Sequence, residues 1–410
     1  MTEQRRPAPE DLDPSLRDRI VAAIDEHENE LISFRRRLHA HPEVSFKEYQ
    51  TTEAIAERLL VEGLRPIRLD SGTGLFCDIG TDGPIIALRA DIDALAMKDA
   101  KNVPYRSQNE GVAHACGHDV HTSTVLGAGL ALKFLADSGD LNGRVRLIFE
   151  PGEESVPGGA IEIVKAGLLD EVDSVFSLHC DPKQMVGHVG SRVGPITSAS
   201  DWVELVIHGP GGHTARPQLT VDMVDTVAMA ARELPGIVAD KLGGWDRARL
   251  VFGSIHAGSA ANVIPARAVL SGSVRTPENA VWERFPQALD EAVTECLADT
   301  GATWDLTHVR GVPPVENEPQ AIYTVAAAAR AVLGPETVGE TEHSWGGDSF
   351  GWMTRATNGA YLRLGTHGPD FEDRLDLHHS RFDVDERCIA IGAKTLAASA
   401  VLGLSLAAAQ

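Results

Sequence analysis

The densest group of potentially reactive side chains in this 410-residue chain lies in the octapeptide HACGHDVH. It contains His114, Cys116, His118, Asp119 and His121. A cysteine and a histidine one residue apart can offer a thiolate and an imidazole to the same cation, and both are good ligands for zinc and similar metals. Gly117 allows a sharp backbone turn between them. A buried cysteine beside surface histidines is the ordinary alternative, and the spacing favours a metal site.

Three further places put ligand-type side chains just after apolar runs typical of buried strands. Asp91 and Asp93 follow ALRA, the residues Glu150, Glu153 and Glu154 lie in IFEPGEES, and His179 ends SVFSLH. Ligands of open α/β sheets bind beyond the carboxyl ends of the strands, so we expect these side chains to converge at one sheet edge. Taken singly, each has an ordinary explanation: a capped turn, a solvated acidic loop and a core histidine.

Two neighbouring glutamates on a loop can point in different directions and hold different protonation states. Glu154 can therefore bind a cation while Glu153 faces a substrate water as a general base. Cys116 is interpreted as a metal ligand because so many other ligands accompany it. A Cys–His nucleophile pair would need the same partners and stays open as an alternative.

The elements that must position these residues follow an alternating pattern. Residues 16–39 predict an amphipathic helix, and strand-like and helix-like runs then alternate up to about residue 180. This order predicts an α/β fold with a mixed, mostly parallel sheet and helices on both faces.

The pattern changes near residue 195. Residues 195–310 read as β-α-β-β-α-β, the order of a ferredoxin-like α+β unit. We therefore expect an inserted domain at 195–310 that divides a catalytic domain into residues 1–194 and 311–410.

Composition excludes several classes of partner. The chain has 37 Lys+Arg against 59 Asp+Glu, a formal net charge of −22, which disfavours nucleic acid and anionic membranes. No run approaches the roughly 18 apolar residues that a membrane helix needs, and residues 1–30 lack a signal-peptide core. Five scattered cysteines argue against a disulfide framework, so we expect a cytoplasmic protein.

The ordered motifs HPEVSFKEYQT, ALRADIDAL, HACGHDVH, IFEPGEE, GGHTARP, NVIP, SGSVRT and LHHSRFDVDE extend over nearly the whole chain. Together they resemble the metallopeptidase family of aminoacylase and glutamate carboxypeptidase. Within it, the similarity is to the amidohydrolases that cleave hippurate, N-acetyl-amino acids and auxin–amino acid conjugates. The resemblance implies a zinc-peptidase-like catalytic domain, an inserted lid and dimerisation domain, and two divalent cations per subunit.

The resemblance also implies roles for individual residues. The metal ligands would be Cys116, His118, Glu154, His179 and His378, with His379 as the less favoured choice for the last position. Glu153 would be the general base, and Asp93 a carboxylate that orients the ligands. In the insert, His213 would reach the partner subunit's site and stabilise the oxyanion, while Asn262 and Arg275 would hold the substrate.

One segment departs from the family pattern. The family usually has Glu-Asp before a phenylalanine, but this chain reads GGDSFGW, so Asp348 and Ser349 take those positions. Because the segment borders the substrate pocket in the family, the substrate is expected to differ from the better-known ones.

We therefore expect a metal-dependent hydrolase of small N-acyl-L-amino acids, a homodimer or larger homo-oligomer, that uses zinc, manganese, cobalt or nickel. A dipeptidase or carboxypeptidase with the same dinuclear site is the nearest alternative. A catalytically silent metal-binding protein is a second alternative. A dinucleotide-dependent oxidoreductase is a third, prompted by SGTGLFCDIG and LGAGLA, neither of which gives the full Gly-x-Gly-x-x-Gly pattern.

Overall fold

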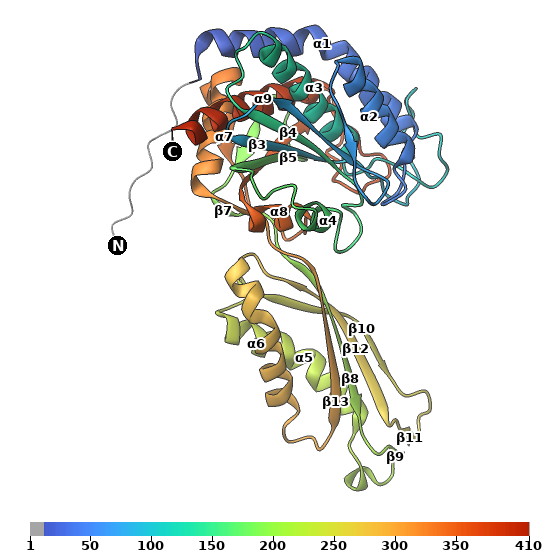
Figure 1. The fold of residues 1–410 in the computed structure, drawn as a ribbon. Helices are drawn as coiled ribbons and strands as arrows, with labels where there is room; N and C mark the ends of the chain where they lie inside the picture. The colour runs from blue at the N-terminus through green and yellow to red at the C-terminus, as the bar shows by residue number, and fades with distance from the viewer. Residues whose placement is uncertain (1–11, 410) are drawn as a thin grey trace. The chain divides into compact units, whose positions relative to one another are not determined.

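The computed structural model describes residues 12–409, which form two compact units (Figure 1). Of the described residues, the first unit contains 12–194, Asn317–Glu342 and 352–409. The second contains Pro195–Glu316 and His343–Gly351. The chain therefore enters the second unit twice, and its segment 343–351 lies within the span that the sequence analysis assigned to the catalytic domain.

The described part of the first unit contains one eight-stranded sheet, in the order β1-β2-β4-β3-β5-β16-β6-β15. Its central strands β4, β3, β5 and β16 pair in parallel, whereas β1, β2 and the β16–β6 pair are antiparallel. The mixed, mostly parallel sheet predicted from the sequence is confirmed. The strands are β1 (Ile67–Arg68), β2 (Leu75–Gly80), β3 (Ile85–Asp91), β4 (Arg144–Glu150), β5 (Ser174–Met185), β6 (Val189–Ser191), β15 (Val338–Glu340) and β16 (Asn358–His367).

Helices cover this sheet, with α1, α3 and α9 on one side and α4 and α8 on the other in Figure 1. Every residue of β3 is buried, as expected for a strand covered on both faces. The helices are α1 (Pro14–Ala40), α2 (Tyr49–Val61), α3 (His118–Asp137), α4 (Ala160–Lys165), α7 (Pro319–Leu333), α8 (Phe350–Ala356) and α9 (Arg387–Ala408), with a short 3-10 helix η2 (Pro335–Thr337).

The last helix, α9, corrects the expectation that no run is as long and apolar as a membrane helix. By length and composition the most apolar window of α9 could cross a membrane. However, 78% of that window is buried, because α9 packs against α1, α3 and α7 and against the sheet. A helix surrounded by other elements is apolar on all sides for that reason.

The glycines of LGAGLA also have a packing role. They lie inside α3, where a Cβ on Gly129 would approach Leu147 to 2.5 Å, and one on Gly127 would approach Leu31 to 2.6 Å. Small residues thus let α3 lie close to its neighbours, and the segment is no strand-to-helix phosphate loop.

The second unit has the order β8-α5-β10-β12-α6-β13, which is the β-α-β-β-α-β order expected for the insert. Its antiparallel sheet runs β10-β12-β8-β13, and α5 and α6 pack together on it. The elements are β8 (Ser200–His208), α5 (Met223–Leu242), β10 (Arg249–Ala257), β12 (Arg267–Arg275), α6 (Asn279–Leu297), β13 (Thr303–Val312), β9 (Gly212–His213), β11 (Val263–Ile264) and η1 (Pro217–Leu219). The paired two-residue strands β7 (Gly194–Pro195) and β14 (Glu316–Asn317) lie at the boundary between the units.

Buried and more exposed side chains alternate along β8. Val203, Leu205 and Ile207 face the helices and are buried, whereas Trp202 on the other face is 61% exposed. Val251 and Val309 are also exposed. The unit therefore has one core face and one open face.

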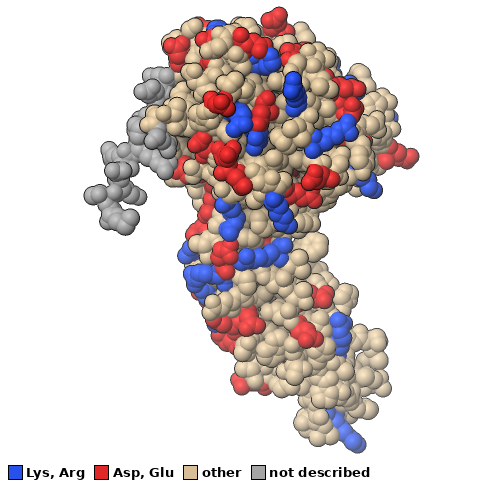
Figure 2. Space-filling view, in the orientation of Figure 1, with Lys and Arg blue, Asp and Glu red and all other residues tan. Residues whose placement is uncertain are grey.

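Charged side chains of both signs lie interspersed on the visible face of the first unit (Figure 2). One buried carboxylate stands apart from them. Glu48 precedes α2, is inaccessible to solvent, and accepts hydrogen bonds of 2.8 Å from the backbone N–H groups of Phe46 and Gly152. Burial raises the pKa of Glu48 to about 7.

Glu48 should therefore make the first unit less stable as the pH rises. A carboxyl group whose pKa is raised by folding stabilises the folded state fully below its unfolded pKa of 4.5. This stabilisation is lost as the pH rises through 7. Glu48→Gln keeps an acceptor oxygen and cannot ionise. Between pH 5 and pH 8 the unfolding free energy of the unchanged chain should fall by about 2–3 kcal/mol more than that of Glu48→Gln. Urea unfolding at each pH measures this difference. Glu57→Gln, on the exposed side of α2, is the control, and equal pH slopes for all three proteins would contradict the assignment.

Candidate metal centre

The ligand-type residues of the first unit gather at the carboxyl edge of its parallel strands. Asp91 is the last residue of β3 and Glu150 the last of β4, while His179 lies on β5 beside them. Because β4, β3 and β5 are neighbours and run in the same direction, the segments that follow them meet.

Four groups of these side chains have ligand atoms within 4.8 Å of one another. The groups are Cys116–His118–His179, Cys116–Glu154–His378, His118–Glu153–Glu154 and Asp91–His118–His121. All five proposed ligands appear among them, and Cys116 is shared by the group with His179 and the group with His378. The structure thus brings together the residues expected to hold two cations.

Gly117 sets the geometry of the Cys116–His118 pair. It precedes the first residue of α3 and has φ = 91°, a left-handed conformation that suits glycine. A Cβ at this position would lie 2.7 Å from Sγ of Cys180. The turn places Sγ of Cys116 3.4 Å from Nε2 of His179.

The two histidines of this group present the same ring nitrogen. Nδ1 of His179 donates to the backbone oxygen of Cys180 at 2.8 Å, and Nδ1 of His118 lies 3.2 Å from a carboxylate oxygen of Asp93. These partners accept hydrogen bonds, so each Nδ1 carries the proton and each Nε2 offers a lone pair. Metal-binding histidines are typically oriented in this way.

Asp93 joins the parts of the centre. Its carboxylate accepts hydrogen bonds from the backbone N–H groups of Glu153 (3.1 Å) and Glu154 (3.0 Å) and from the Ser45 hydroxyl (2.7 Å). Burial acts to raise the pKa of Asp93, but the imidazole of His118, the Ser45 hydroxyl and the backbone N–H of Glu154 lower it below its usual value. Asp93 therefore stays ionised, orients His118 and fixes the glutamate loop. Ser45 is a contributor that the sequence analysis did not identify.

Asp91 and His121 form a separate pair beneath the centre. Nδ1 of His121 donates to Asp91 at 2.6 Å, and its Nε2 accepts from the backbone N–H of Cys180 at 2.9 Å. Arg89 binds the other Asp91 oxygen at 2.8 Å. Both ring nitrogens of His121 are therefore used within the protein, which argues against a ligand role for it.

Glu150 is likewise structural, because its two oxygens accept from Arg89 Nε at 2.6 Å and from the backbone N–H of Ala160 at 2.7 Å. His114 lies in the same octapeptide as Cys116 but belongs to none of the four groups. Burial lowers the pKa of His114 to about 3, so it is a neutral core residue.

His378, and not His379, faces the centre. Nε2 of His378 lies 3.3 Å from Oε1 of Glu154, and its backbone N–H donates to the oxygen of Ala115 at 2.8 Å. It adopts φ = 62°, which costs a non-glycine residue roughly 1–2 kcal/mol. Nδ1 of His379 instead accepts from the backbone N–H of Arg381 at 3.1 Å, within its own turn.

The donor set fits divalent cations. Nε2 of His118 and Oε1 of Glu154 are buried without a hydrogen-bond partner and lie 3.9 Å apart. Buried polar atoms nearly always have partners, so two lone-pair atoms that face one space without a hydrogen bond indicate a cation between them. Thiolate, imidazole and carboxylate together suit zinc, manganese, cobalt or nickel.

The substrate residues expected in the insert lie in the second unit, at two separate places. His213 on β9 pairs with Val263 on β11, beside Asn262, and both His213 and Asn262 are exposed. Arg275 is the last residue of β12. The first residue of that strand, Arg267, pairs with His208, the last residue of β8, from which the chain continues to β9. Arg267 and Arg275 are the first and last of the nine residues of β12, so Arg275 lies roughly 25 Å along the strand from the end near β9.

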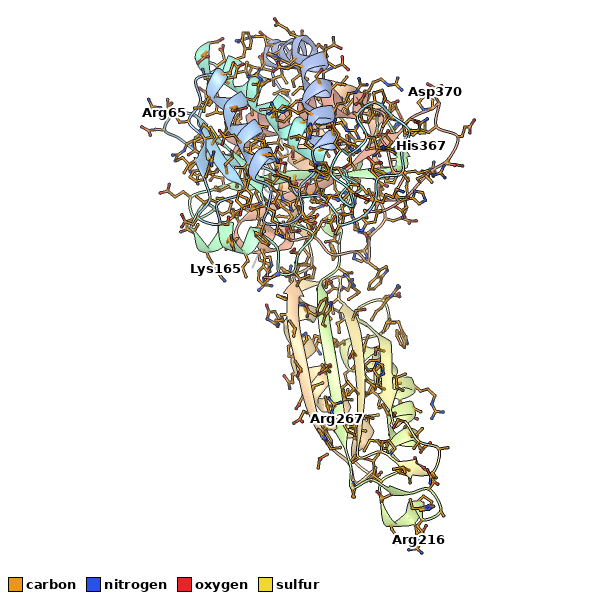
Figure 3. The ribbon with its side chains drawn as sticks, turned by 90° about the vertical axis from the view of Figure 1, so that its right-hand side faces the viewer. Arg65, Lys165, Arg216, Arg267, His367 and Asp370 are labelled. Atoms are coloured by element: carbon orange, nitrogen blue, oxygen red, sulfur yellow. The ribbon has the colours of Figure 1, made fainter. Side chains whose placement is uncertain are left out.

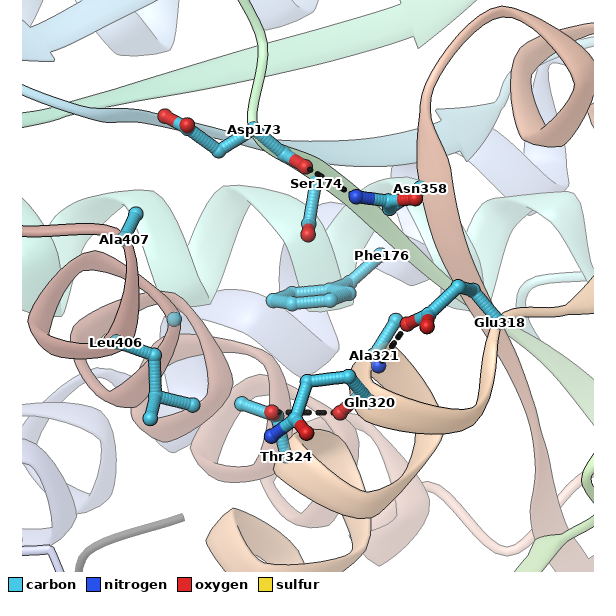
Figure 4. Close-up of a pocket in the computed structure, with 11 residues that line it drawn as sticks. Asp173, Ser174, Phe176, Glu318, Gln320, Ala321, Thr324, Asn358, Leu406 and Ala407 are labelled. Atoms are coloured by element: carbon cyan, nitrogen blue, oxygen red, sulfur yellow. Dashed lines mark hydrogen bonds between the residues drawn. The ribbon is translucent and has the colours of Figure 1, made fainter. Parts of the chain in front are cut away.

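A cavity of about 80 Å³ lies at the opposite, amino edge of the large sheet (Figure 4). Its acidic residues are already used: Glu318 caps α7 by accepting from the backbone N–H of Ala321, and Asp173 accepts from that of Ile85. It therefore offers no competing catalytic centre.

A sequence profile of peptidase family M20/M25/M40 matches residues 87–401, a span that includes all five proposed ligands. The chain belongs to this family. An N-acetylcysteine deacetylase from Bacillus subtilis is 33% identical over 377 residues, which cover 91% of this chain and 97% of that protein. The crystal structure of a dinuclear metal binding M20 peptidase from the same organism matches with a TM-score of 0.80 and 31% identity, covering 93% of this chain and 99% of that one.

A longer protein from Rhodococcus jostii carries the name of a glutamate–cysteine ligase. It is 39% identical over 373 residues, which cover 90% of this chain but only 46% of that protein. This chain thus spans about half the length of that relative.

Gly117→Ala should lower the metal content of the purified protein. The added Cβ would meet Sγ of Cys180 and would have to adopt φ = 91°, so the turn between Cys116 and His118 should shift. Gly111→Ala is a matched control, because Gly111 also has positive φ (75°) but nothing within 4 Å of a Cβ. Elemental analysis after gel filtration should show lost metal in the first variant alone. Equal metal content in both would show that the turn is not what fixes the ligands.

Proposed function

We propose that this protein is a metal-dependent amidohydrolase that cleaves the amide bond of N-acyl-L-amino acids. The observation that supports this most is the convergence of Cys116, His118, Glu154, His179 and His378 beside Glu153. Membership of the M20 family and the name of the N-acetylcysteine deacetylase relative point to the same chemistry.

Two divalent cations would be held by these five ligands. When bound, they supply Lewis-acid activation of a water molecule and of the substrate carbonyl. The ligand atoms suit zinc, manganese, cobalt or nickel.

Glu153 acts as the proton carrier in this proposal. One of its carboxylate oxygens lies 4.0 Å from Nε2 of His118, and its backbone N–H is held by Asp93. Glu153 takes a proton from the attacking water as the carbon–oxygen bond forms, and gives it to the leaving nitrogen as the amide bond breaks. The products are a carboxylic acid and a free amino acid.

The second unit would supply the remaining groups as a lid and dimerisation domain. His213 is proposed to stabilise the oxyanion in the partner subunit's site, with Asn262, while Arg275 holds the substrate carboxylate. The separation of His213 from Arg275 along one chain supports a site completed by two copies.

The location and the other partners stay predictions. All five cysteines are unpaired, which suits a reducing cytoplasm. The net charge of −22 disfavours nucleic acid and anionic membranes as partners.

Glu153→Gln should lower kcat by roughly 10²- to 10⁴-fold with bound metal unchanged, because the amide cannot accept the proton. Turnover is measured on acetyl- and benzoyl-amino acids and on unblocked dipeptides, which separates an aminoacylase from a dipeptidase. Glu162→Gln in α4 is the control, since that carboxylate lies outside the four ligand groups. Near-normal turnover of the metal-loaded Glu153→Gln protein would exclude Glu153 as the base.

His213→Ala and Glu153→Gln should each be nearly inactive alone and should complement one another when mixed under subunit exchange. A mixed dimer would contain one site with Glu153 from one chain and His213 from the other. Random pairing should then restore about a quarter of the unchanged activity. No recovery, with exchange shown by differently tagged chains, would mean that His213 serves its own chain or none.

A further inference from the structure

Two arginines lie opposite each other at one end of the sheet in the second unit. Arg249 begins β10, Arg275 ends β12, and the two are paired in the antiparallel register. Directly opposite residues project from the same face of a sheet. Their neighbours Leu250 and Val274 are buried in the core, so both arginines belong to the open face, where each is half-buried.

Neither guanidinium has a carboxylate partner among residues 12–409. Arg249 donates from Nε to the backbone oxygen of Trp245 at 3.4 Å, which leaves its charge uncompensated. The carboxylate whose charge acts on Arg275 is Asp201. Asp201, however, already accepts hydrogen bonds from Trp282, His308 and the backbone N–H of Gly311, at 2.8, 2.8 and 2.9 Å.

Such a pair is unfavourable by itself. Like charges directly opposite each other destabilise a sheet, and burial lowers the pKa of Arg275 despite the field of Asp201. In a chain with 59 acidic residues, a carboxylate partner for these two arginines would be readily available. Within residues 12–409 no carboxylate is bound to either guanidinium, so both are available to an anion from outside the chain.

The segment 343–351 holds both arginines in position. The guanidinium of Arg249 stacks on the ring of Trp345 with 3.5 Å between its central carbon and the ring centroid. A Cβ on Gly347 would lie 3.5 Å from Nη1 of Arg275, so the same segment also lies close to the second arginine. Stacking fixes the plane of a guanidinium and leaves its edge for a planar anion.

This segment is the one that departs from the family pattern. Asp348 is only 3% exposed and accepts a hydrogen bond from the backbone N–H of Phe350 at 2.8 Å, at the start of α8. Asp348 is therefore buried, and the residues of the segment that lie beside the arginines are Trp345 and the small Gly347.

We propose that Arg249 binds the free carboxylate of the substrate together with Arg275. The two guanidinium groups then favour N-acyl amino acids that have a free carboxylate over the corresponding uncharged amides. This inference rests on the proposed amidohydrolase function and adds a specificity residue to it. A carboxylate has two oxygens, and each can accept from one guanidinium edge.

The test compares an N-acetyl-amino acid with its uncharged C-terminal amide. Arg249→Gln should raise KM for the acid by about tenfold to a hundredfold and change kcat little, because the lost contact is present in both ground and transition states. The amide should be unaffected, so the ratio of kcat/KM for acid over amide should fall by the same factor. Arg249→Lys should restore part of it, since lysine keeps the charge without the planar edge.

Arg267→Gln is the control, because Arg267 lies at the other end of β12 (Figure 3). An unchanged acid-over-amide ratio in Arg249→Gln, in a protein that hydrolyses N-acetyl-amino acids, would overturn this inference and leave the proposed function standing. Failure of the unchanged protein to cleave any N-acyl amino acid would overturn both.

Discussion

The carboxylate of Asp93 is the interaction on which the candidate metal centre depends. Removing a carboxylate from water costs several kcal/mol, and Asp93 is 1% exposed. Hydrogen bonds to a charged group contribute roughly 1.5–3 kcal/mol each, and Asp93 accepts from His118, Ser45 and the backbone of Glu153 and Glu154. These donors come from three separate segments of the chain. One buried charge therefore fixes the imidazole of one ligand and the loop that carries another.

Much of this arrangement could be predicted because it follows from short-range patterns. The continuously apolar run of β3 identifies a strand buried on both faces, and the polar residues after it then have to lie at the carboxyl edge of the sheet. The Cys-Gly-His spacing predicts a turn, and Gly117 occupies a left-handed conformation there. The α/β class and the family are confirmed, while the catalytic roles of the site residues stay predictions.

What the sequence did not reveal depends on contacts between distant segments. Arg35 lies in a charged stretch of α1, yet it is buried, and it binds Asp119 at 2.6 Å and Asp383 at 3.1 Å. Arg35 lies one helical turn after the buried Leu31, and this spacing indicated that it faces the core. An arginine on an apolar face is, however, normally assigned to the surface. The roles of His121 and the position of segment 343–351 depend likewise on partners that no local pattern specifies.

The chemistry of Cys116 follows from the same burial. A nucleophilic cysteine needs a lowered pKa and access to substrate, and it is usually found in an electropositive, partly exposed place. Cys116 is 7% exposed, and burial together with the charge of Glu154 raises its pKa well above the usual range. A thiol in this position loses its proton only if a cation compensates the charge. Carboxylates, which disfavour a lone thiolate, are the natural co-ligands of a metal-bound one, so the surroundings of Cys116 favour a ligand over a nucleophile.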